Sequence, residues 1–90
     1  MELRFRPESS LAIITMDDKI QGSRARQLED LFATVKEQGG TTVVLDFTAC
    51  RSMDSVAAMM IESALEDGLR ILALGVRKTM ETDLSRNGLP

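Results

Sequence analysis

The chain has 90 residues, enough for one small domain with a single core. It contains no His, one Cys and no Trp or Tyr. This excludes histidine-based catalysis, internal disulfides and cysteine clusters for metals, and it leaves few rings on which bases could stack. A net charge of −3 argues against binding to a nucleic-acid backbone. The composition therefore favours a binding or signalling module over an enzyme.

The apolar runs are far too short for a membrane span, and the N-terminal MELRFRPESS lacks the apolar core of a signal peptide. A lone cysteine, Cys50, is typical of a small core residue in a reducing compartment. We therefore expect a cytoplasmic protein with no membrane insertion, no nucleic-acid partner, no metal and no cofactor.

The first two elements are predicted to form a β-hairpin. Leu3 and Phe5 alternate with charged residues, which indicates a half-exposed strand. Residues 7–10 are a turn cluster, and the apolar run 11–16 is the second strand. Residues 17–22 are predicted to be a loop in which Asp17 and Asp18 are solvated.

Residues 23–38 carry the clearest helical pattern, with Ser23 as the expected N-cap and Gly39–Gly40 as the end. Its apolar residues recur at helical spacing: Leu28, Leu31, Phe32 and Val35. The β-branched run 41–47 then predicts a central strand buried on both faces, with Asp46 at its carboxyl end.

A loop over residues 49–53 leads to a second predicted helix, residues 53–67. One apolar stripe is expected to bury this helix: Met53, Ala57, Met60, Ile61 and Ala64. Residues 69–74 predict a further strand, and residues 77–87 a last helix with Met80 and Leu84 facing inward.

This order, β-β-α-β-α-β-α, predicts an α/β fold in one domain, residues 1–90. We expect a mixed, mostly parallel sheet with an N-terminal hairpin, packed against helices.

Several sites with recognisable motifs are missing from the sequence. Neither a glycine-rich phosphate loop nor a CxxC pair occurs. A phosphate-receiver domain needs paired acidic residues after an early strand, an Asp after a central strand and a Lys after a late strand. Asp17–Asp18 and Asp46 match the acidic positions, but no Lys follows the 69–74 strand in the expected loop. An enzyme would need Lys, Ser or carboxylate chemistry, and no such residues converge.

The informative segment is LDFTACRSMDSVAAMM, residues 45–60. A buried strand ends, a short loop follows, and Met53–Asp54–Ser55 opens a helix that Ser52 or Asp54 can cap. One interpretation is simply a capped helix start. The other is a binding site, because α/β folds place ligands and partners at the carboxyl edge of the sheet, near helix N-termini.

Over residues 2–89 the sequence resembles the STAS domain family, through its element order, the VVLDF strand, the Met-Asp-Ser helix opening and the LRILALGV strand. The family includes bacterial anti-sigma factor antagonists and cytoplasmic domains of sulphate transporters. Its members usually continue with another strand and helix, so the resemblance implies a shortened member or a trimmed piece of one.

The family's segment typically reads Asp-Ser-Ser/Thr-Gly, and a partner kinase of the ATPase type, itself the anti-sigma factor, phosphorylates the residue after the first Ser. Here Asp54 and Ser55 match, but Val56 stands at the phosphoacceptor position and Ala57 at the Gly. The usual phospho-switch is therefore in doubt, and Ser55 or Ser52 is the substitute candidate.

Replacing the hydroxyl by an isopropyl group makes this surface permanently uncharged. Val56 and Met59 lie off the buried stripe and predict a small apolar patch, although Met59 at the periphery of the core is the plainer interpretation. The predicted partner-binding residues are Ser52, Met53, Asp54, Ser55, Val56 and Met59.

The resemblance implies a non-catalytic antagonist-like domain that binds a kinase-like anti-sigma factor or another regulatory protein. The alternative is a scaffold or regulatory STAS module, in a homo-oligomeric assembly or attached to a transporter.

Overall fold

The structure is a computed structural model that describes residues 1–76. The helix predicted at 77–87 lies outside these residues. The described elements are β1 (Glu2–Arg6), the 3₁₀ helix η1 (Pro7–Ser9), β2 (Leu11–Thr15), β3 (Lys19–Ile20), α1 (Ser23–Glu37), β4 (Thr42–Asp46), β5 (Ser52–Met53), α2 (Ser55–Glu66) and β6 (Arg70–Leu74).

Four strands form one mixed sheet in the order β1-β2-β4-β6. β1 and β2 are an antiparallel hairpin, whereas β2 with β4 and β4 with β6 are parallel. Each parallel pair is joined through a helix, as parallel strands require. The predicted hairpin and mostly parallel sheet are confirmed.

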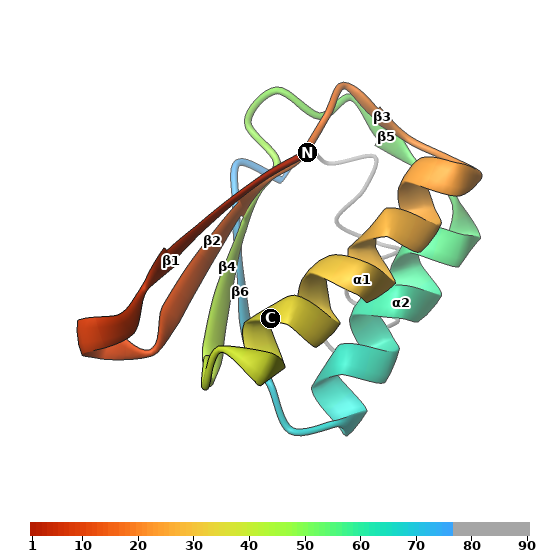
Figure 1. Ribbon diagram of the computed structural model, residues 1–90. Helices are drawn as coiled ribbons and strands as arrows, with labels where there is room; N and C mark the ends of the chain where they lie inside the picture. Colours follow the sequence, from red (N-terminus) through yellow and green to blue (C-terminus); the bar gives the residue numbers. More distant parts are fainter. Residues whose placement is uncertain (77–90) are drawn as a thin grey trace.

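Both helices lie side by side on one face of the sheet (Figure 1). They bury the apolar faces that their sequence periodicity predicts, and α1 also buries Ala25 while α2 also buries Ala58. The largest fully buried side chains fill the space between helices and sheet: Phe47, Ile14, Met16, Ile20, Leu28, Leu45, Ile61, Val35, Val43 and Cys50. Cys50 is thus a core residue, as expected.

The prediction that the central strand is buried on both faces was wrong. Along β4, Val43 and Leu45 are fully buried, whereas Thr42 and Val44 are half-buried. Both described helices pack on the face that carries Val43 and Leu45. Among residues 1–76, the β-branched run coincides with a central position in the sheet, where β4 has a strand on each side.

Two segments predicted to be loops contain a second, two-stranded parallel sheet, β3 with β5. The backbone N–H of Arg51 donates to the carbonyl of Asp18 (2.7 Å), and that of Asp54 to the carbonyl of Ile20 (3.0 Å). Strands of two residues are too short to produce a periodic pattern, so they could not be predicted from the sequence.

Both helix starts also differ from the prediction. Ser23 is the first residue of α1, and the N-cap is Gly22, with no side-chain cap. The second helix begins at Ser55 rather than at residue 53, because Met53 belongs to β5 and Asp54 is the N-cap. Within residues 1–76 no helix has the length and apolar character needed to cross a membrane.

Candidate functional site

The candidate site is the start of α2, beyond the carboxyl ends of β4 and β6. The small β3–β5 sheet lies there, next to the first turns of both helices (Figure 1). The structure brings the six predicted partner-binding residues together along one continuous segment: Ser52 and Met53 in β5, Asp54 at the N-cap, and Ser55, Val56 and Met59 in α2.

Asp54 joins the two helix starts. One carboxylate oxygen accepts the N–H of Ala57 in α2 at 2.9 Å, which caps the helix as predicted. The other accepts the N–H of Gly22 at 3.0 Å, at the start of α1. The N–H of Ala57 first, and then that of Gly22, hold the pKa of Asp54 below its ordinary value. The carboxylate is therefore engaged within the domain, and its role is to position this edge.

Gly22 was missed by sequence reasoning, although it is the second partner of Asp54. It has φ +57° and ψ −121°, a backbone conformation that favours glycine. A glycine before a helical pattern was the available signal, but its bond to a carboxylate 32 residues away leaves no trace in the sequence.

The two serines differ in accessibility. Ser55 is exposed at the first position of α2, where the helix dipole favours negative charge, whereas Ser52 is half-buried in β5. Ser52 also offers its carbonyl to the Cys50 thiol, with a sulfur–oxygen distance of 3.4 Å. Of the two candidate phosphoacceptors, Ser55 is thus the more accessible.

Of the two residues in the predicted apolar patch, only one is clearly exposed. The side chain of Met59 is 57% exposed, so the interpretation of Met59 as peripheral core is wrong. Val56 is half-buried and packs against the core, so only part of it contributes to the surface. The patch thus consists of the exposed side chain of Met59 and the solvent-accessible part of Val56, near the capped start of α2.

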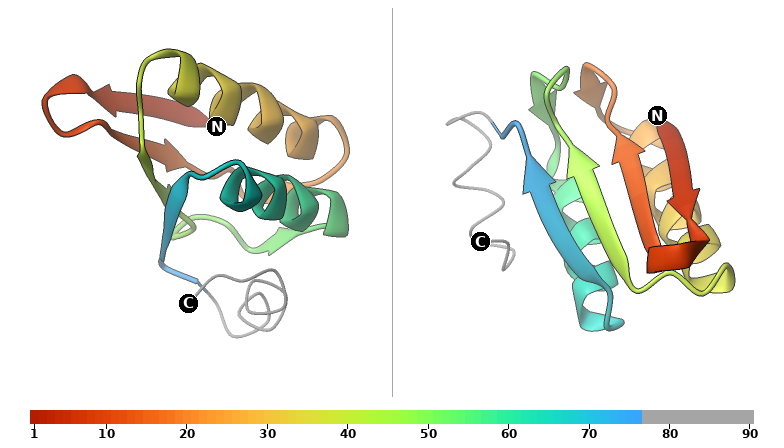
Figure 2. Two further views of the ribbon diagram at one scale, coloured as in Figure 1. Left: turned by 90° about the horizontal axis from the view of Figure 1, so that it is seen from below. Right: turned by 90° about the vertical axis from the view of Figure 1, so that its left-hand side faces the viewer.

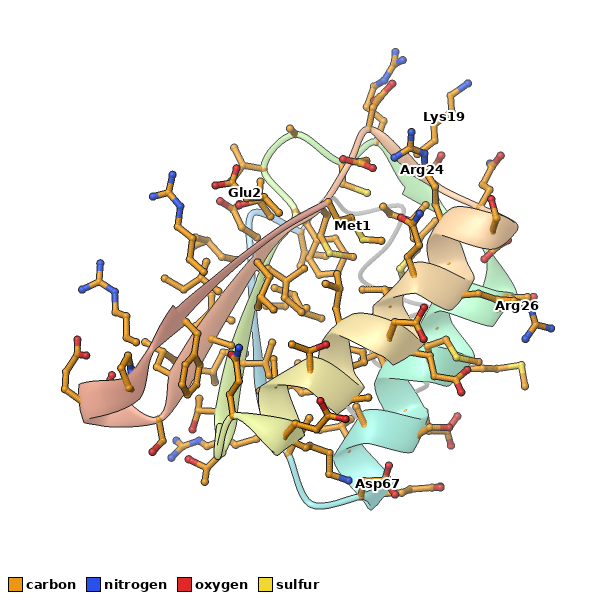
Figure 3. All side chains as sticks on the ribbon, in the orientation of Figure 1. Met1, Glu2, Lys19, Arg24, Arg26 and Asp67 are labelled. Atoms are coloured by element: carbon orange, nitrogen blue, oxygen red, sulfur yellow. The ribbon has the colours of Figure 1, made fainter. Side chains whose placement is uncertain are left out.

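Charged side chains surround this edge. Asp18 receives two bonds from the Arg51 guanidinium, at 2.6 and 2.8 Å. Asp17 pairs with Arg24 and with the terminal amino group. Both aspartates are accessible to solvent, as predicted, and each is in addition part of an ion pair that the sequence did not indicate. Lys19 and Arg24 project from the same end of the molecule (Figure 3). The charges at this edge are thus of both signs, and Arg24 and Arg51 are paired with carboxylates.

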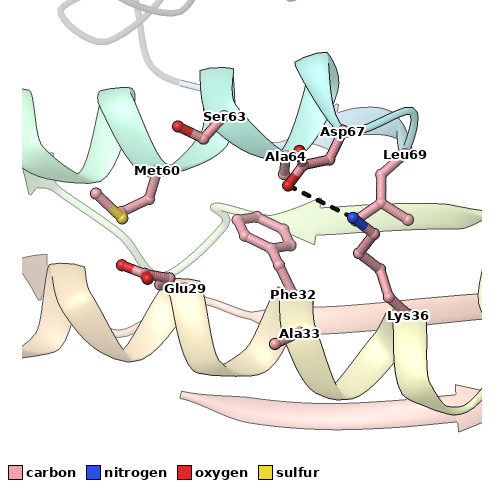
Figure 4. A pocket seen from close by; sticks show the side chains of 9 residues that line it. All are labelled: Glu29, Phe32, Ala33, Lys36, Met60, Ser63, Ala64, Asp67 and Leu69. Carbon is pink, nitrogen blue, oxygen red and sulfur yellow. Dashed lines mark ion pairs between the residues drawn. The ribbon is translucent and has the colours of Figure 1, made fainter.

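A separate groove of about 340 Å³ lies between α1 and α2. Figure 4 shows Phe32, Met60 and Leu69 among its lining, and the Lys36–Asp67 ion pair (3.4 Å) at one end. Met60, predicted to be buried, is half-buried because it lines this groove.

Metal binding finds no support among the described residues, which include no group of three potential ligands of the His, Cys, Asp or Glu type.

Comparison with solved structures identifies the fold. The unphosphorylated anti-sigma factor antagonist SpoIIAA matches with a TM-score of 0.76 and 20% identity, over 93% of this chain and 80% of that one. The phosphorylated form, described as a Bacillus cell fate determinant, matches with a TM-score of 0.78 and 18% identity, over 97% and 82%.

A structure of Mglu also matches, with a TM-score of 0.67 and 18% identity, over 86% of this chain but 20% of that one. No family model and no curated protein sequence matches the chain. The chain therefore has the STAS fold of SpoIIAA, as its element order and strand motifs indicated.

Proposed function

We propose that this chain is a STAS-type regulatory domain, without catalysis of its own, that docks a protein partner on the start of α2. The fold shared with an anti-sigma factor antagonist supports this class of function. The observation that carries the site is Met59, 57% exposed one turn after the N-cap of a firmly anchored helix. Exposed methionines adapt to partner surfaces at low cost.

The proposed partner is a cytoplasmic anti-sigma factor of the ATPase kinase type, and the proposed outcome is regulation of transcription. Ser55, Val56 and Met59 would contact it directly, with Ser52 and Met53 at the rim. Asp54 would hold the contact surface in place through its bonds to Ala57 and Gly22.

Ser55 is the proposed phosphoacceptor if the partner phosphorylates this chain. A phosphate on its exposed hydroxyl would lie at the N-terminus of α2, where the helix dipole favours negative charge, and next to the Asp54 carboxylate that caps the helix. The same charge would stand next to Met59 and weaken an apolar contact.

The test is calorimetric binding to each purified ATPase-type anti-sigma factor of the source organism. For the binder, Met59→Glu should raise the dissociation constant at least about tenfold, because a charge replaces a buried contact. Glu62→Gln, also on the exposed side of α2, is the matched control and should bind as the natural chain does. Failure of every candidate to bind, or equal binding by Met59→Glu, would refute the proposal.

The scaffold or transporter module remains the second candidate because Val56 carries no hydroxyl to phosphorylate. A discrete assembly of many copies in native mass spectrometry would favour the scaffold over the antagonist.

A further inference from the structure

The outer face of the four-stranded sheet, which we define as the face turned away from α1 and α2, is seen in Figure 2 (right). The strand pairing gives this face an ordered pattern of side chains. The strand register places them in three rows across the sheet. The row at the amino end of β4 is Arg6, Leu11, Thr42 and Arg70. The middle row is Arg4, Ile13, Val44 and Leu72. The row at the carboxyl end is Glu2, Thr15, Asp46 and Leu74.

The middle of this outer face is apolar and accessible. Leu72 is 41% and Leu74 56% exposed, and Ile13 and Val44 continue the apolar strip as half-buried side chains. Both described helices cover the opposite face (Figure 2). A contiguous exposed apolar strip of this kind marks an interaction surface more often than scattered single residues do.

The charges on the outer face are arranged by sign. Two arginines, Arg6 and Arg70, end the row at the amino end of β4, whereas two carboxylates, Glu2 and Asp46, lie in the row at the carboxyl end. A second copy laid on this face with its strands antiparallel would bring Arg6 over Glu2 of the partner subunit, and Arg70 over Leu74 of the partner subunit. A copy laid with its strands parallel would instead set Arg6 over Arg70 of the partner subunit.

We propose that two copies of this chain associate through their outer faces, about a two-fold axis that runs across the strands. Arg6 then lies opposite Glu2 of the partner subunit, and the reverse contact repeats it. The four residues of the middle row meet their own counterparts, as a self-complementary two-fold interface requires. Arg4 thus faces Arg4 of the partner subunit at the edge of the interface, and its ion pair with Glu2 (3.1 Å) reduces the repulsion. Sheets packed face to face in this way lie about 10 Å apart.

The area of the outer face sets the strength of the pairing. Four strands about 4.8 Å apart and five residues long, at about 3.3 Å each, present a planar area of about 300 Å² per copy. Stable complexes bury about 800 Å² per partner. We therefore expect a weak dimer with a dissociation constant on the order of 100 µM.

The pairing is independent of the proposed docking on α2, because that helix lies on the other side of the sheet (Figure 1). Failure of one proposal leaves the other intact.

Sedimentation velocity of the full chain, from about 10 µM to about 1 mM, tests the pairing. The mass should rise from that of a monomer toward that of a dimer, and Leu72→Glu should weaken association at least about tenfold. Glu37→Arg, on α1, is the matched surface control and should associate as the natural chain does. Circular dichroism confirms that each variant folds.

Charge reversal tests the orientation. Glu2→Arg and Arg6→Glu should each weaken the dimer, and the double variant should restore it, because both exposed side chains exchange roles across the axis. A chain that stays monomeric at all concentrations would overturn the proposal. So would a dimer that is indifferent to Leu72→Glu, or a double variant no better than the single ones.

Discussion

The carboxylate of Asp54 is shared between two segments that lie 32 residues apart in the chain. Local pattern predicted one of its bonds, the cap on Ala57, because an Asp before an apolar helical repeat is a common N-cap. The bond to Gly22 depends on tertiary structure and was not predictable. The same residue therefore had a predictable local role and an unpredictable long-range one.

Replacing Asp54 should separate these two roles. We expect Asp54→Ala to lower the free energy of unfolding by about 2 kcal/mol, because both N–H bonds are lost. Asp54→Ser should lose about half of that, since its hydroxyl can still cap Ala57. Urea unfolding followed by circular dichroism measures both values. Equal losses in the two variants would show that the bond to Gly22 contributes nothing.

Among the elements, α1, α2 and β1 were predictable because their apolar residues recur with a clear period. The strands β2, β4 and β6 were predictable because each is a short apolar run bounded by turn residues. β3 and β5 were not, because two residues define no period. The small sheet is nevertheless attached to the core by Ile20, whose side chain is fully buried although its neighbours in the sequence, Lys19 and Gln21, are exposed. Its stability therefore depends on one side chain more than on its few backbone bonds.

Truncating that side chain tests the attachment of the small sheet. Ile20→Ala should cost about 2–4 kcal/mol of unfolding free energy, because it leaves a cavity in the core. Its neighbour Lys19 is exposed, so Lys19→Ala should change stability by less than about 0.5 kcal/mol. Thermal and urea unfolding of the pair provide the comparison, and similar effects of both substitutions would contradict it.

For the whole molecule, carboxylates near the carboxyl edge of the sheet make the fold sensitive to acid. The terminal amino group lowers the pKa of Asp17, Thr48 that of Asp46, and the N–H groups of Ala57 and Gly22 that of Asp54. Because the unfolded chain then binds more protons than the folded one, stability must decline as the pH falls.

The stability that these three carboxylates contribute should be fully present above the ordinary aspartate pKa of about 3.9. It should disappear as the pH falls through the lower pKa values that they have in the folded chain. Urea midpoints measured between about pH 6 and pH 2.5 should drop most steeply below about pH 4.5. A combined Asp17→Asn, Asp46→Asn and Asp54→Ser variant should show a shallower drop. Parallel curves for the two proteins would rule out these carboxylates as the cause.

At this scale, the element order and strand composition predicted the layered fold, because strands and helices alternate with short connections. The distribution of surface groups was less predictable. Met59 is exposed and Val56 half-buried although both lie off the predicted stripe, because Val56 packs against the edge of the core and Met59 does not. The pairing of Asp18 with Arg51 joins distant segments, so only the folded chain reveals it.

The strand order β1-β2-β4-β6 also determines the sequence in which the strands can pair while the chain is being synthesised. The hairpin of β1 and β2 is complete early, because its strands are neighbours in sequence. β4 can then pair with β2 on one side. Its pairing with β6 on the other side is possible only after α2, which precedes β6 in the chain, has been synthesised. Until β6 pairs with β4, the buried side chain of Ile71 is missing from the core beneath α2. We therefore expect the buried face of α2 to stay partly uncovered in a nascent chain until β6 has left the ribosome and paired with β4.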